Sequence, residues 1–423
     1  MFKYLYITSK RRSDVHRFYR QLYLEHEKIW NNFKEFDNPS KNSAEKFIDS
    51  FEETFVDIQK NNFDFNRPIH IWENGDIANG AHRLAICAAL QKDISVKLVT
   101  SPIYQWDWSY FQQRGLQKSS SDIIALEYVK LNPNAYIVCL FPSMPMQYDD
   151  YVIRILNQYG YVYYKKEFTL SVNGCINIHK ISYGKEDWID SYDNNFANLQ
   201  RRALKTTGGQ QEGTMRSFVF VCDNLEKVKE AKKQIRAILN IGNYPVHIND
   251  TKEEAIELAQ TFFNDNSLYM LNKLPFNQRM DRIDYLVNEF KQYIFKNGYN
   301  ADDLCAMGST PMGVFGLRKN NDFDFLHLDQ DIVKPDNPIF SQHTSELSYY
   351  PVSLSEIVIN PANHFFYKGV KFITLDLLKE MKKIRNQQKD MNDVRIIDEF
   401  VMGNTYYCLP FSKIPETTTK HLF

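Results

Sequence analysis

The chain has 423 residues, of which 43% are hydrophobic and 24% charged, and its 51 basic and 52 acidic side chains leave a formal net charge of -1. This length exceeds what one hydrophobic core usually supports, so about two to four domains are expected. The charge balance excludes a whole-protein attraction for nucleic acid or anionic lipid, and no nucleic-acid partner is expected.

Neither a secretory signal nor a membrane span is predicted. The opening MFKYLYITSKRR places its charges after a short apolar stretch, and no run reaches the roughly 18 apolar residues that a span needs. We therefore expect a cytoplasmic protein with reduced thiols, because its cysteines are scattered and form no CxxC pair. These cysteines are Cys87, Cys139, Cys175, Cys222, Cys305 and Cys408.

The first 131 residues predict a small α/β domain. Apolar residues at helical spacing predict helices up to about residue 60, broken by Asp37-Asn38-Pro39-Ser40. The alternating run at 68–72 and the turn Glu73-Asn74-Gly75-Asp76 predict a β-hairpin. The next segment, Gly80-Ala81-His82-Arg83, opens a helix that runs through Leu90.

Gly80, His82 and Arg83 form a candidate phosphate site at this helix start. Free backbone amides and the positive end of the helix dipole would meet two side chains that donate to oxyanions. The alternative is that Asn79 caps the helix while His82 and Arg83 face water.

The segment 68–90 resembles the ParB and sulfiredoxin fold, whose members bind nucleotide phosphates at a Gly-x-His-Arg helix start. The resemblance implies that Gly80, His82 and Arg83 bind a nucleotide such as ATP or CTP. Ala81 replaces the cysteine of the reductase motif, so reduction of cysteine sulfinate is not expected. In a kinase, Glu25 or Glu27 would supply the carboxylate base.

A second domain is expected after a break at residues 131–134. Predicted strands at 136–140, 161–164 and 218–221 alternate with predicted helices around 152–156 and 225–239. A further helix begins at Lys252, where Asp250 or Thr251 can act as the cap. This alternation predicts an α/β or α+β sandwich.

The stretch from Ile235-Arg236 to Val246-His247-Ile248-Asn249-Asp250-Thr251 is similar to the active segment of nucleoside diphosphate kinases. The first strand, residues 135–142, also resembles that family. The resemblance implies a ferredoxin-like sandwich in which His247 is phosphorylated and Arg236 binds phosphate. Phe141 replaces the family's lysine, so one phosphate contact is lost, and a degenerate domain with a structural histidine is the alternative. His179 and His343 show no sequence partner that singles them out.

The C-terminal part predicts a third α/β domain. A helix at 282–295 leads to AMGSTPMGVFGLRKNNDFDF, in which a glycine turn precedes two aspartates separated by one apolar residue. Predicted strands follow at 322–328, 356–359 and 369–373. Helices at 375–383 and 390–400 close the chain.

Asp322 and Asp324 are predicted to share one face of their strand, since residues two apart in a strand point the same way. The Gly308-Ser309 turn permits close backbone approach, and Arg318 adds a cation for phosphates. Carboxylates beside such a turn suit Mg²⁺ and a nucleoside triphosphate. An edge strand with two solvated aspartates is the alternative.

Met307-Gly308-Ser309 and Asp322-Phe323-Asp324-Phe325 resemble the signature of the nucleotidyltransferase superfamily related to DNA polymerase beta. The segment 370–378 is similar to the strand and helix that follow the site in small members. The resemblance implies Mg²⁺ held by Asp322 and Asp324, with a third carboxylate from a later strand, for which Glu356 is the best candidate. Asp329 and Asp331 are nearer but are expected to face solvent.

Together these features predict an α+β multidomain chain. The expected domains are ParB/sulfiredoxin-like at 1–131, nucleoside-diphosphate-kinase-like at 132–272 and nucleotidyltransferase-like at 273–423. The expected function is nucleotide-dependent phosphoryl or nucleotidyl transfer to a small metabolite, for example in making an activated precursor of bacterial surface polysaccharide. The alternatives are a non-catalytic nucleotide-responsive regulator and a toxin-like nucleotidyltransferase that modifies protein or RNA. The oligomeric state is left open.

Overall fold

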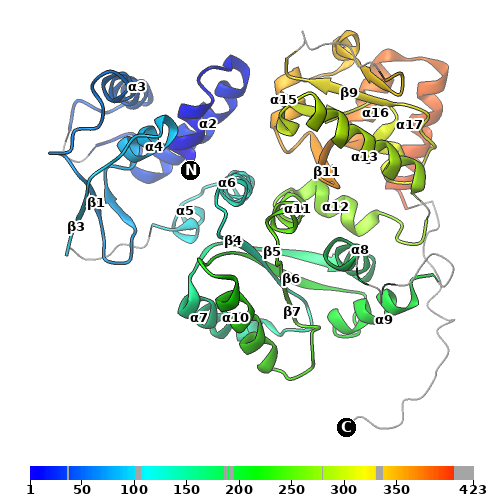
Figure 1. Cartoon of the computed structure of the whole chain (residues 1–423). Helices are drawn as coiled ribbons and strands as arrows, with labels where there is room; N and C mark the ends of the chain where they lie inside the picture. Colours follow the sequence, from blue (N-terminus) through cyan, green and yellow to red (C-terminus); the bar gives the residue numbers. More distant parts are fainter. Residues whose placement is uncertain are drawn as a thin grey trace.

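The computed structural model describes residues 1–35, 38–100, 106–184, 186, 189, 195–278, 280–329 and 337–403, and both Asp331 and Cys408 lie outside these ranges. Within the described residues, the strands form three sheets, one in each of three successive parts of the chain. Figure 1 shows these parts in blue, in cyan to green, and in yellow to orange. The expected mixed α and β class is confirmed at this level.

The first part packs helices around a small sheet of order β2-β1-β3. The antiparallel β1–β2 pair is the predicted hairpin, and β3 joins the other side of β1 in parallel. Buried aromatic residues, including Tyr6, Tyr23 and Phe51, form the core between α1, α2, α3 and α4. The elements are α1 (Phe2–Thr8), α2 (Ser13–Asn31), α3 (Ala44–Asn61), β1 (Ile69–Ile71), β2 (Ile77–Asn79), α4 (Ala81–Leu90), β3 (Val96–Leu98), α5 (Trp108–Gln113) and α6 (Lys118–Leu131).

The middle part is built on a sheet of order β5-β6-β4-β7 in which every neighbouring pair is antiparallel. Its elements are β4 (Ala135–Leu140), η1 (Met146–Tyr148), α7 (Asp149–Tyr159), β5 (Tyr161–Ser171), α8 (Val172–Tyr183), α9 (Ala197–Thr206), β6 (Glu212–Val221), α10 (Leu225–Ala237), β7 (Val246–Ile248), α11 (Lys252–Phe262) and α12 (Asp265–Lys273). Of the two residues expected to cap α11, Asp250 and Thr251, the cap is Thr251, whose hydroxyl accepts a hydrogen bond from the Glu254 amide.

Helices cover both faces of this sheet because its strand residues alternate between two cores. Val138 and Leu140 pack with α7 and α10, whereas Ile137 and Cys139 pack with α8 and α11. Figure 1 shows the two helix layers on opposite sides of the strands. Helix α6, expected to belong with the first part, also packs into the second of these cores.

The C-terminal part has a mixed sheet of order β10-β9-β8-β12-β11. Phe323 and Phe325 of β9 are fully buried against Phe290 of α13, so Asp324 lies on the other face of the strand. The elements are α13 (Asp281–Lys296), η3 (Ala301–Asp303), β8 (Leu304–Ala306), α14 (Thr310–Val314), β9 (Phe323–His327), β10 (Phe340–Gln342), η4 (Thr344–Tyr349), α15 (Leu354–Ile359), β11 (His364–Tyr367), β12 (Val370–Ile373), α16 (Leu375–Arg385) and α17 (Gln388–Val401).

The prediction of a strand at residues 356–359 is wrong, because this segment belongs to helix α15. The Ser353 hydroxyl accepts from the Glu356 amide at 3.3 Å and caps the helix. Ile357 and Val358 are both fully buried. A short apolar run does not distinguish a buried helix from a strand, and the serine cap is the feature that decides here.

Two expectations about the whole chain can be compared with the structure. The cysteines among the described residues are buried free thiols. Across the described ranges, no helix is both long enough and apolar enough to cross a bilayer.

Candidate functional site

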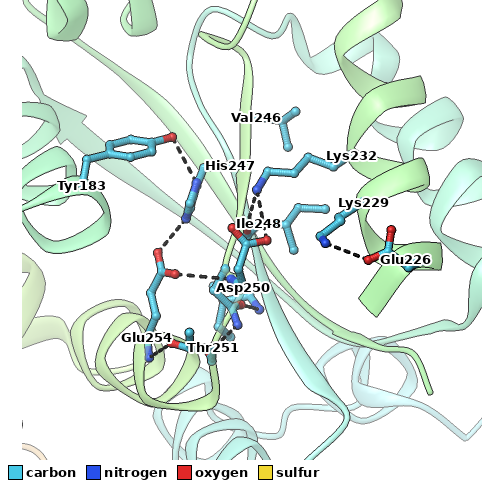
Figure 2. Close-up of polar contacts among 12 residues, drawn as sticks. Tyr183, Glu226, Lys229, Lys232, Val246, His247, Ile248, Asp250, Thr251 and Glu254 are labelled. Carbon is cyan, nitrogen blue, oxygen red and sulfur yellow. Dashed lines mark hydrogen bonds and ion pairs between the residues drawn. The ribbon is translucent and has the colours of Figure 1, made fainter. Parts of the chain in front are cut away.

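His247 lies on β7 between two residues that face the core beneath α7 and α10. Because side chains alternate along a strand, His247 points to the opposite face, toward α8 and α11. Figure 2 shows its imidazole between Tyr183, the last residue of α8, and Glu254, in the first turn of α11. The residue is 4% exposed.

Both ring nitrogens of His247 have a partner. Nε2 lies 2.7 Å from Glu254 Oε1, and since an ionised carboxylate only accepts, Nε2 carries the proton and donates it. Nδ1 lies 3.0 Å from the Tyr183 hydroxyl, and in the neutral ring it accepts from that hydroxyl. Glu254 therefore selects the tautomer that leaves the lone pair on Nδ1.

Burial keeps both His247 and Tyr183 uncharged. Burial lowers the pKa of His247 below its ordinary value, although the hydrogen bond and charge of Glu254 act in the other direction. Burial also raises the pKa of Tyr183, so its hydroxyl keeps its proton. At neutral pH the site thus holds a neutral imidazole, which is the nucleophilic form.

Two arginines make the surroundings of Tyr183 cationic. Arg202 Nη2 donates to the Tyr183 hydroxyl at 3.1 Å, and its guanidinium lies 4.6 Å from the centre of the Tyr183 ring. Arg236 is close enough for its charge, like that of Arg202, to oppose the rise in the Tyr183 pKa. Guanidinium groups are strong partners for phosphate oxygens.

Three buried polar atoms of α8 and α10 lack hydrogen-bond partners within the described part of the chain. They are His179 Nδ1, Ser182 Oγ and Arg236 Nε. His179 is fully buried, and its ring centre lies 5.8 Å from that of Tyr183. An unsatisfied buried polar atom costs about 1–3 kcal/mol, so such a group is expected where a polar ligand completes the hydrogen bonds.

Phe141, at the position of the family's lysine, is 1% exposed and belongs to the core. Its ring centre lies 5.2 Å from that of His179. Its apolar side chain packs in this core and supplies no phosphate contact.

Gly308 and Asp324 are in direct contact in the C-terminal part. Gly308 has a φ of +62°, and a Cβ at this position would overlap Asp324 Oδ2. The Met307 amide donates to the Asp324 carbonyl at 2.8 Å. The antiparallel pairing of β8 with β9 thus brings the glycine turn against the aspartate strand.

Two of the other predicted residues of this site, Ser309 and Arg318, have partners within the fold. Asp322 is exposed just before β9. The Ser309 hydroxyl accepts from Asn320 Nδ2 at 3.0 Å. Arg318 Nη1 donates to Asp393 Oδ2 of α17 at 2.7 Å, so α17 holds the cation that was expected to meet phosphates.

His343 is the partner of Asp324 that the sequence did not reveal. His343 Nε2 lies 2.9 Å from Asp324 Oδ1. The hydrogen bond to Asp324 raises the pKa of His343, even though burial opposes it. A histidine before η4 thus completes one side of the predicted carboxylate site.

Glu356 does not come from a strand, and its Oε2 accepts from Asn360 Nδ2 at 2.8 Å. In the described residues, no group of three or more His, Cys, Asp or Glu side chains is arranged to hold a metal ion. Asp322 and Asp324 still offer hard oxygen donors that suit Mg²⁺, an ion often held by one or two carboxylates together with nucleotide phosphates. Asp324 Oδ1 is engaged by His343 and Asp322 is exposed just before β9, so a Mg²⁺ role for this pair stays a prediction.

At the start of α4, His82 and Arg83 are both engaged within the fold. His82 Nε2 lies 3.0 Å from the Tyr23 hydroxyl. Arg83 donates to the backbone carbonyls of Arg67 and Pro68. Gly80, with a φ of +97°, occupies the cap position in place of Asn79. His82 points into the fold, whereas Arg83 stays partly exposed, so the alternative with both side chains in water fails for His82 alone. The phosphate role stays a prediction.

The two carboxylates considered as a kinase base also have partners. Glu25 accepts from the Gln117 amide and the Ser120 hydroxyl. Glu27 is 1% exposed and pairs with Lys3 and His26. Burial raises the pKa of Glu27, but the Lys3 charge and the His26 hydrogen bond outweigh it and hold this pKa well below its usual range. A carboxylate held in this way is a weak base.

Comparison of the chain with protein-family models, curated proteins and solved structures gave no match. The three resemblances therefore remain predictions from short motifs.

The partners that the sequence reasoning missed are Tyr183, Arg202 and His343. Glu254 could be noticed because it lies seven residues after His247, in the first turn of the next helix. Tyr183 and Arg202 carried no local signal, because only the packing of α8 and α9 brings them to His247.

Proposed function

We propose that this chain is a nucleotide-dependent transferase that passes a phosphoryl group, through His247, from ATP or CTP to a small-molecule acceptor. The observation that carries this proposal is the placement of the His247 ring, with Nε2 donating to Glu254 and Nδ1 accepting from Tyr183. A buried histidine held on both nitrogens has one defined tautomer, and its unprotonated nitrogen lies beside a hydroxyl to which Arg202 donates.

In the first step, His247 Nδ1 attacks the terminal phosphorus of the nucleotide. The Nδ1–P bond forms, the bond from phosphorus to the bridging oxygen breaks, and the nucleoside diphosphate leaves. Glu254 stabilises the positive charge that develops on the ring. The Tyr183 hydroxyl turns from Nδ1 to a phosphoryl oxygen, while Arg202 and Arg236 offset the charge of the phosphates.

In the second step, an acceptor hydroxyl attacks the same phosphorus. The O–P bond forms, the Nδ1–P bond breaks, and the acceptor proton passes to water. His247 returns to its neutral form. The partner-free atoms of His179, Ser182 and Arg236 supply hydrogen-bonding capacity that a bound phosphate would use.

The test is incubation of the full chain with γ-labelled ATP and, separately, γ-labelled CTP. We expect acid-labile label on the protein, and none in His247→Gln. His70→Gln, on β1 of the first part, is the control and keeps the label. Label retained in His247→Gln, or no label from either nucleotide, rules out the phosphohistidine.

Nucleotidyl transfer at the C-terminal site is the second candidate, favoured by the contact between Gly308 and Asp324. The glycine turn would hold the triphosphate, and Asp322 with Asp324 would hold Mg²⁺, which neutralises phosphate charge. An acceptor oxygen would attack the α-phosphorus, and pyrophosphate would leave.

Asp322→Asn combined with Asp324→Asn should abolish acceptor-dependent pyrophosphate release while leaving the unfolding midpoint unchanged. Asp376→Asn is the matched control, because this carboxylate is 80% exposed on α16. Retained transfer in the double variant would remove the C-terminal site from the proposal. Label in the α position reports this site, and label in the γ position reports His247.

The same assays separate the two alternatives. A nucleotide-responsive regulator would bind the nucleotide and release neither diphosphate nor pyrophosphate with any acceptor. A toxin-like transferase would place α-label into protein or RNA of a lysate. The enzyme proposed here instead labels a small acceptor.

A further inference from the structure

A cavity of about 210 Å³ lies where the first part of the chain meets the third. Residues of α1, α2 and α6 line one side, and residues of η3, β11 and β12 line the other. Helix α2 also contacts α15, and Figure 1 shows α2 and α6 on the side of the first part that faces α15. The lining includes no residue assigned above to the His247 site or the Asp324 site.

The charged side chains in this cavity balance. The lining residues include three cations, Arg12, Lys130 and Lys371, and three carboxylates, Glu127, Asp302 and Asp303. Burial lowers the pKa of His364, another lining residue, to about 3, so this imidazole is neutral. The wall therefore carries no net charge at neutral pH.

These charges pair across the junction between the first and third parts. Arg12 Nη2 lies 2.8 Å from Asp303 Oδ1, and Lys130 Nζ lies 2.8 Å from Asp302 Oδ1. Lys371, 6% exposed, donates to the Asp302 carbonyl at 2.7 Å. Lys130 also lies 2.8 Å from Glu127 Oε1, so each of the three carboxylates has a cationic partner to which a ligand would add a contact.

Tyr19 of α2 adds an unused donor. Within the residues that the structure describes, its hydroxyl has no hydrogen-bond partner, although the residue lines the cavity. Burial raises the pKa of Tyr19, and the nearby carboxylates Glu127 and Asp302 raise it further. The hydroxyl therefore keeps its proton and can donate to a ligand.

We propose that this cavity binds a small zwitterion with one ammonium and one carboxylate group, of the size of an α-amino acid. A ligand with a net charge would leave an uncompensated charge in a neutral, half-buried space, which is costly. A zwitterion adds no net charge: its carboxylate can bind Arg12 and Tyr19 while its ammonium binds Asp303 or Glu127.

The size and the apolar wall agree with such a ligand. At about 30 Å³ per water molecule, the cavity has room for roughly seven waters. Apolar side chains complete the lining and can contact a ligand side chain; they include Leu5, Val15 and Leu126 from the first part, Phe263 from the middle part and Ile359 from the third. A bound zwitterion would bridge α2 and η3 and hold the two parts together, independently of any chemistry at His247.

The test is calorimetric titration of the full chain with each proteinogenic amino acid. We expect at least one amino acid to bind. Its N-acetyl and carboxamide derivatives each lack one charge, so their affinity should be lower by about tenfold or more. Tyr19→Phe should weaken binding about tenfold, since one hydrogen bond to a charged group is lost. Tyr151→Phe, on α7, should leave binding unchanged.

Hydrogen exchange locates the site without a variant. The bound amino acid should slow exchange in α1, α2 and η3. The proposal is overturned by binding of no amino acid, by equal binding of the singly charged derivatives, or by unchanged binding in Tyr19→Phe. Protection confined to α8 or β9 also overturns it, and this readout decides the question if Tyr19→Phe does not fold.

Discussion

The Tyr183 hydroxyl and His247 Nδ1 meet at 3.0 Å, although the two residues are separated by 64 positions in the chain. Tyr183 ends α8, and His247 is the central residue of β7. Arg202 of α9 donates to the same hydroxyl, and Glu254 of α11 accepts from the other ring nitrogen. This hydrogen-bonded series exists only when α8, α9 and α11 are packed on one face of the sheet.

Tyr183→Phe removes the hydroxyl but keeps the ring over which Arg202 lies. We expect phosphohistidine formation to slow by about tenfold, because one hydrogen bond contributes about 1–1.5 kcal/mol and 1.36 kcal/mol corresponds to a factor of ten in rate. Single-turnover labelling with γ-labelled nucleotide measures this rate. Tyr151→Phe, whose ring is 48% exposed, should behave as the parent protein. An unchanged rate in Tyr183→Phe would mean that the hydroxyl takes no part.

The pH dependence of labelling should reflect the lowered pKa of His247. The neutral imidazole is the nucleophile, so labelling is lost as pH falls through the pKa of the folded protein. Since burial lowers this pKa, the rate should stay level down to the ordinary histidine value of about 6.5 and fall only below it. A midpoint at or above that value would contradict the assignment.

Glu254→Gln tests the second effect on the same pKa. Glu254 raises the pKa of His247 through its hydrogen bond and charge. The amide keeps an acceptor oxygen but loses the charge, so the midpoint should move to lower pH and the plateau rate should fall. Glu253→Gln, the neighbouring residue in the first turn of α11, is the control. The midpoint of that variant should stay where it is in the parent protein.

The local sequence predicted those parts of the fold in which the residue pattern fits only one type of secondary structure. The hairpin at β1 and β2 follows from its turn residues, and the burial of Phe323 and Phe325 follows from the two-residue period of a strand. Capping chemistry predicted a cap at Asp250 or Thr251, and the structure shows that Thr251 is the cap. The helix at residues 356–359 could not be predicted in this way, because three apolar residues fit a helix as well as a strand. Strand β3 was missed because its residues are exposed and its pairing with β1 is not local.

The contacts in the candidate sites also fall into those that the local sequence could predict and those that it could not. Gly308 and Asp324 could be linked in advance through the spacing of the glycine turn and the aspartate pair, and the antiparallel pairing of β8 with β9 brings them together. The partners of His247 and Asp324 on other elements, Tyr183 and His343, could not. Which helix residue faces a strand depends on how whole helices pack, and the periodicity of a single segment does not encode that arrangement.

Gly308→Ala should be more damaging than a matched change at Gly298. Both glycines have nearly the same φ, +62° and +64°, so the backbone strain of an alanine is the same, about 1 kcal/mol. A Cβ at 308 would also overlap Asp324, whereas one at 298 meets no atom within 4 Å.

The difference between the two alanine variants therefore measures the contact with Asp324. We expect Gly308→Ala to lower the free energy of unfolding by about 1–3 kcal/mol more than Gly298→Ala, and to reduce nucleotidyl transfer. Chemical denaturation of both variants checks the first expectation, and pyrophosphate release checks the second. Equal effects would place the glycine turn away from the aspartate strand.

Asp390 of α17 should contribute stability that depends on pH. It is 0% exposed and accepts from Arg385 Nη2 at 2.7 Å, with Lys382 Nζ at 3.3 Å. Burial raises the pKa of Asp390, but the hydrogen bond of Arg385 and the charge of Lys382 outweigh burial and lower this pKa to about 2. Because the pKa is lower in the folded state, the stabilisation is present above the unfolded value of about 3.9 and is lost as pH falls through about 2.

Asp390→Asn removes the buried carboxylate shared by Lys382 and Arg385, although Lys382 keeps Asp393 and Arg385 keeps Glu346. The charge-assisted hydrogen bonds of Asp390 are lost, so the free energy of unfolding at neutral pH should fall by about 1.5–3 kcal/mol. Asp398→Asn is the control, because its pair with Lys379 is 36% exposed on the carboxylate side and should cost about 1 kcal/mol or less. Denaturant titrations of the three proteins at neutral pH and at progressively lower pH measure both effects. The gap between parent and Asp390→Asn should narrow below about pH 4, because the unfolded parent then takes up a proton that the folded parent does not. A gap that is small at neutral pH, or that widens in acid, would show that Arg385 and Lys382 do not depend on Asp390.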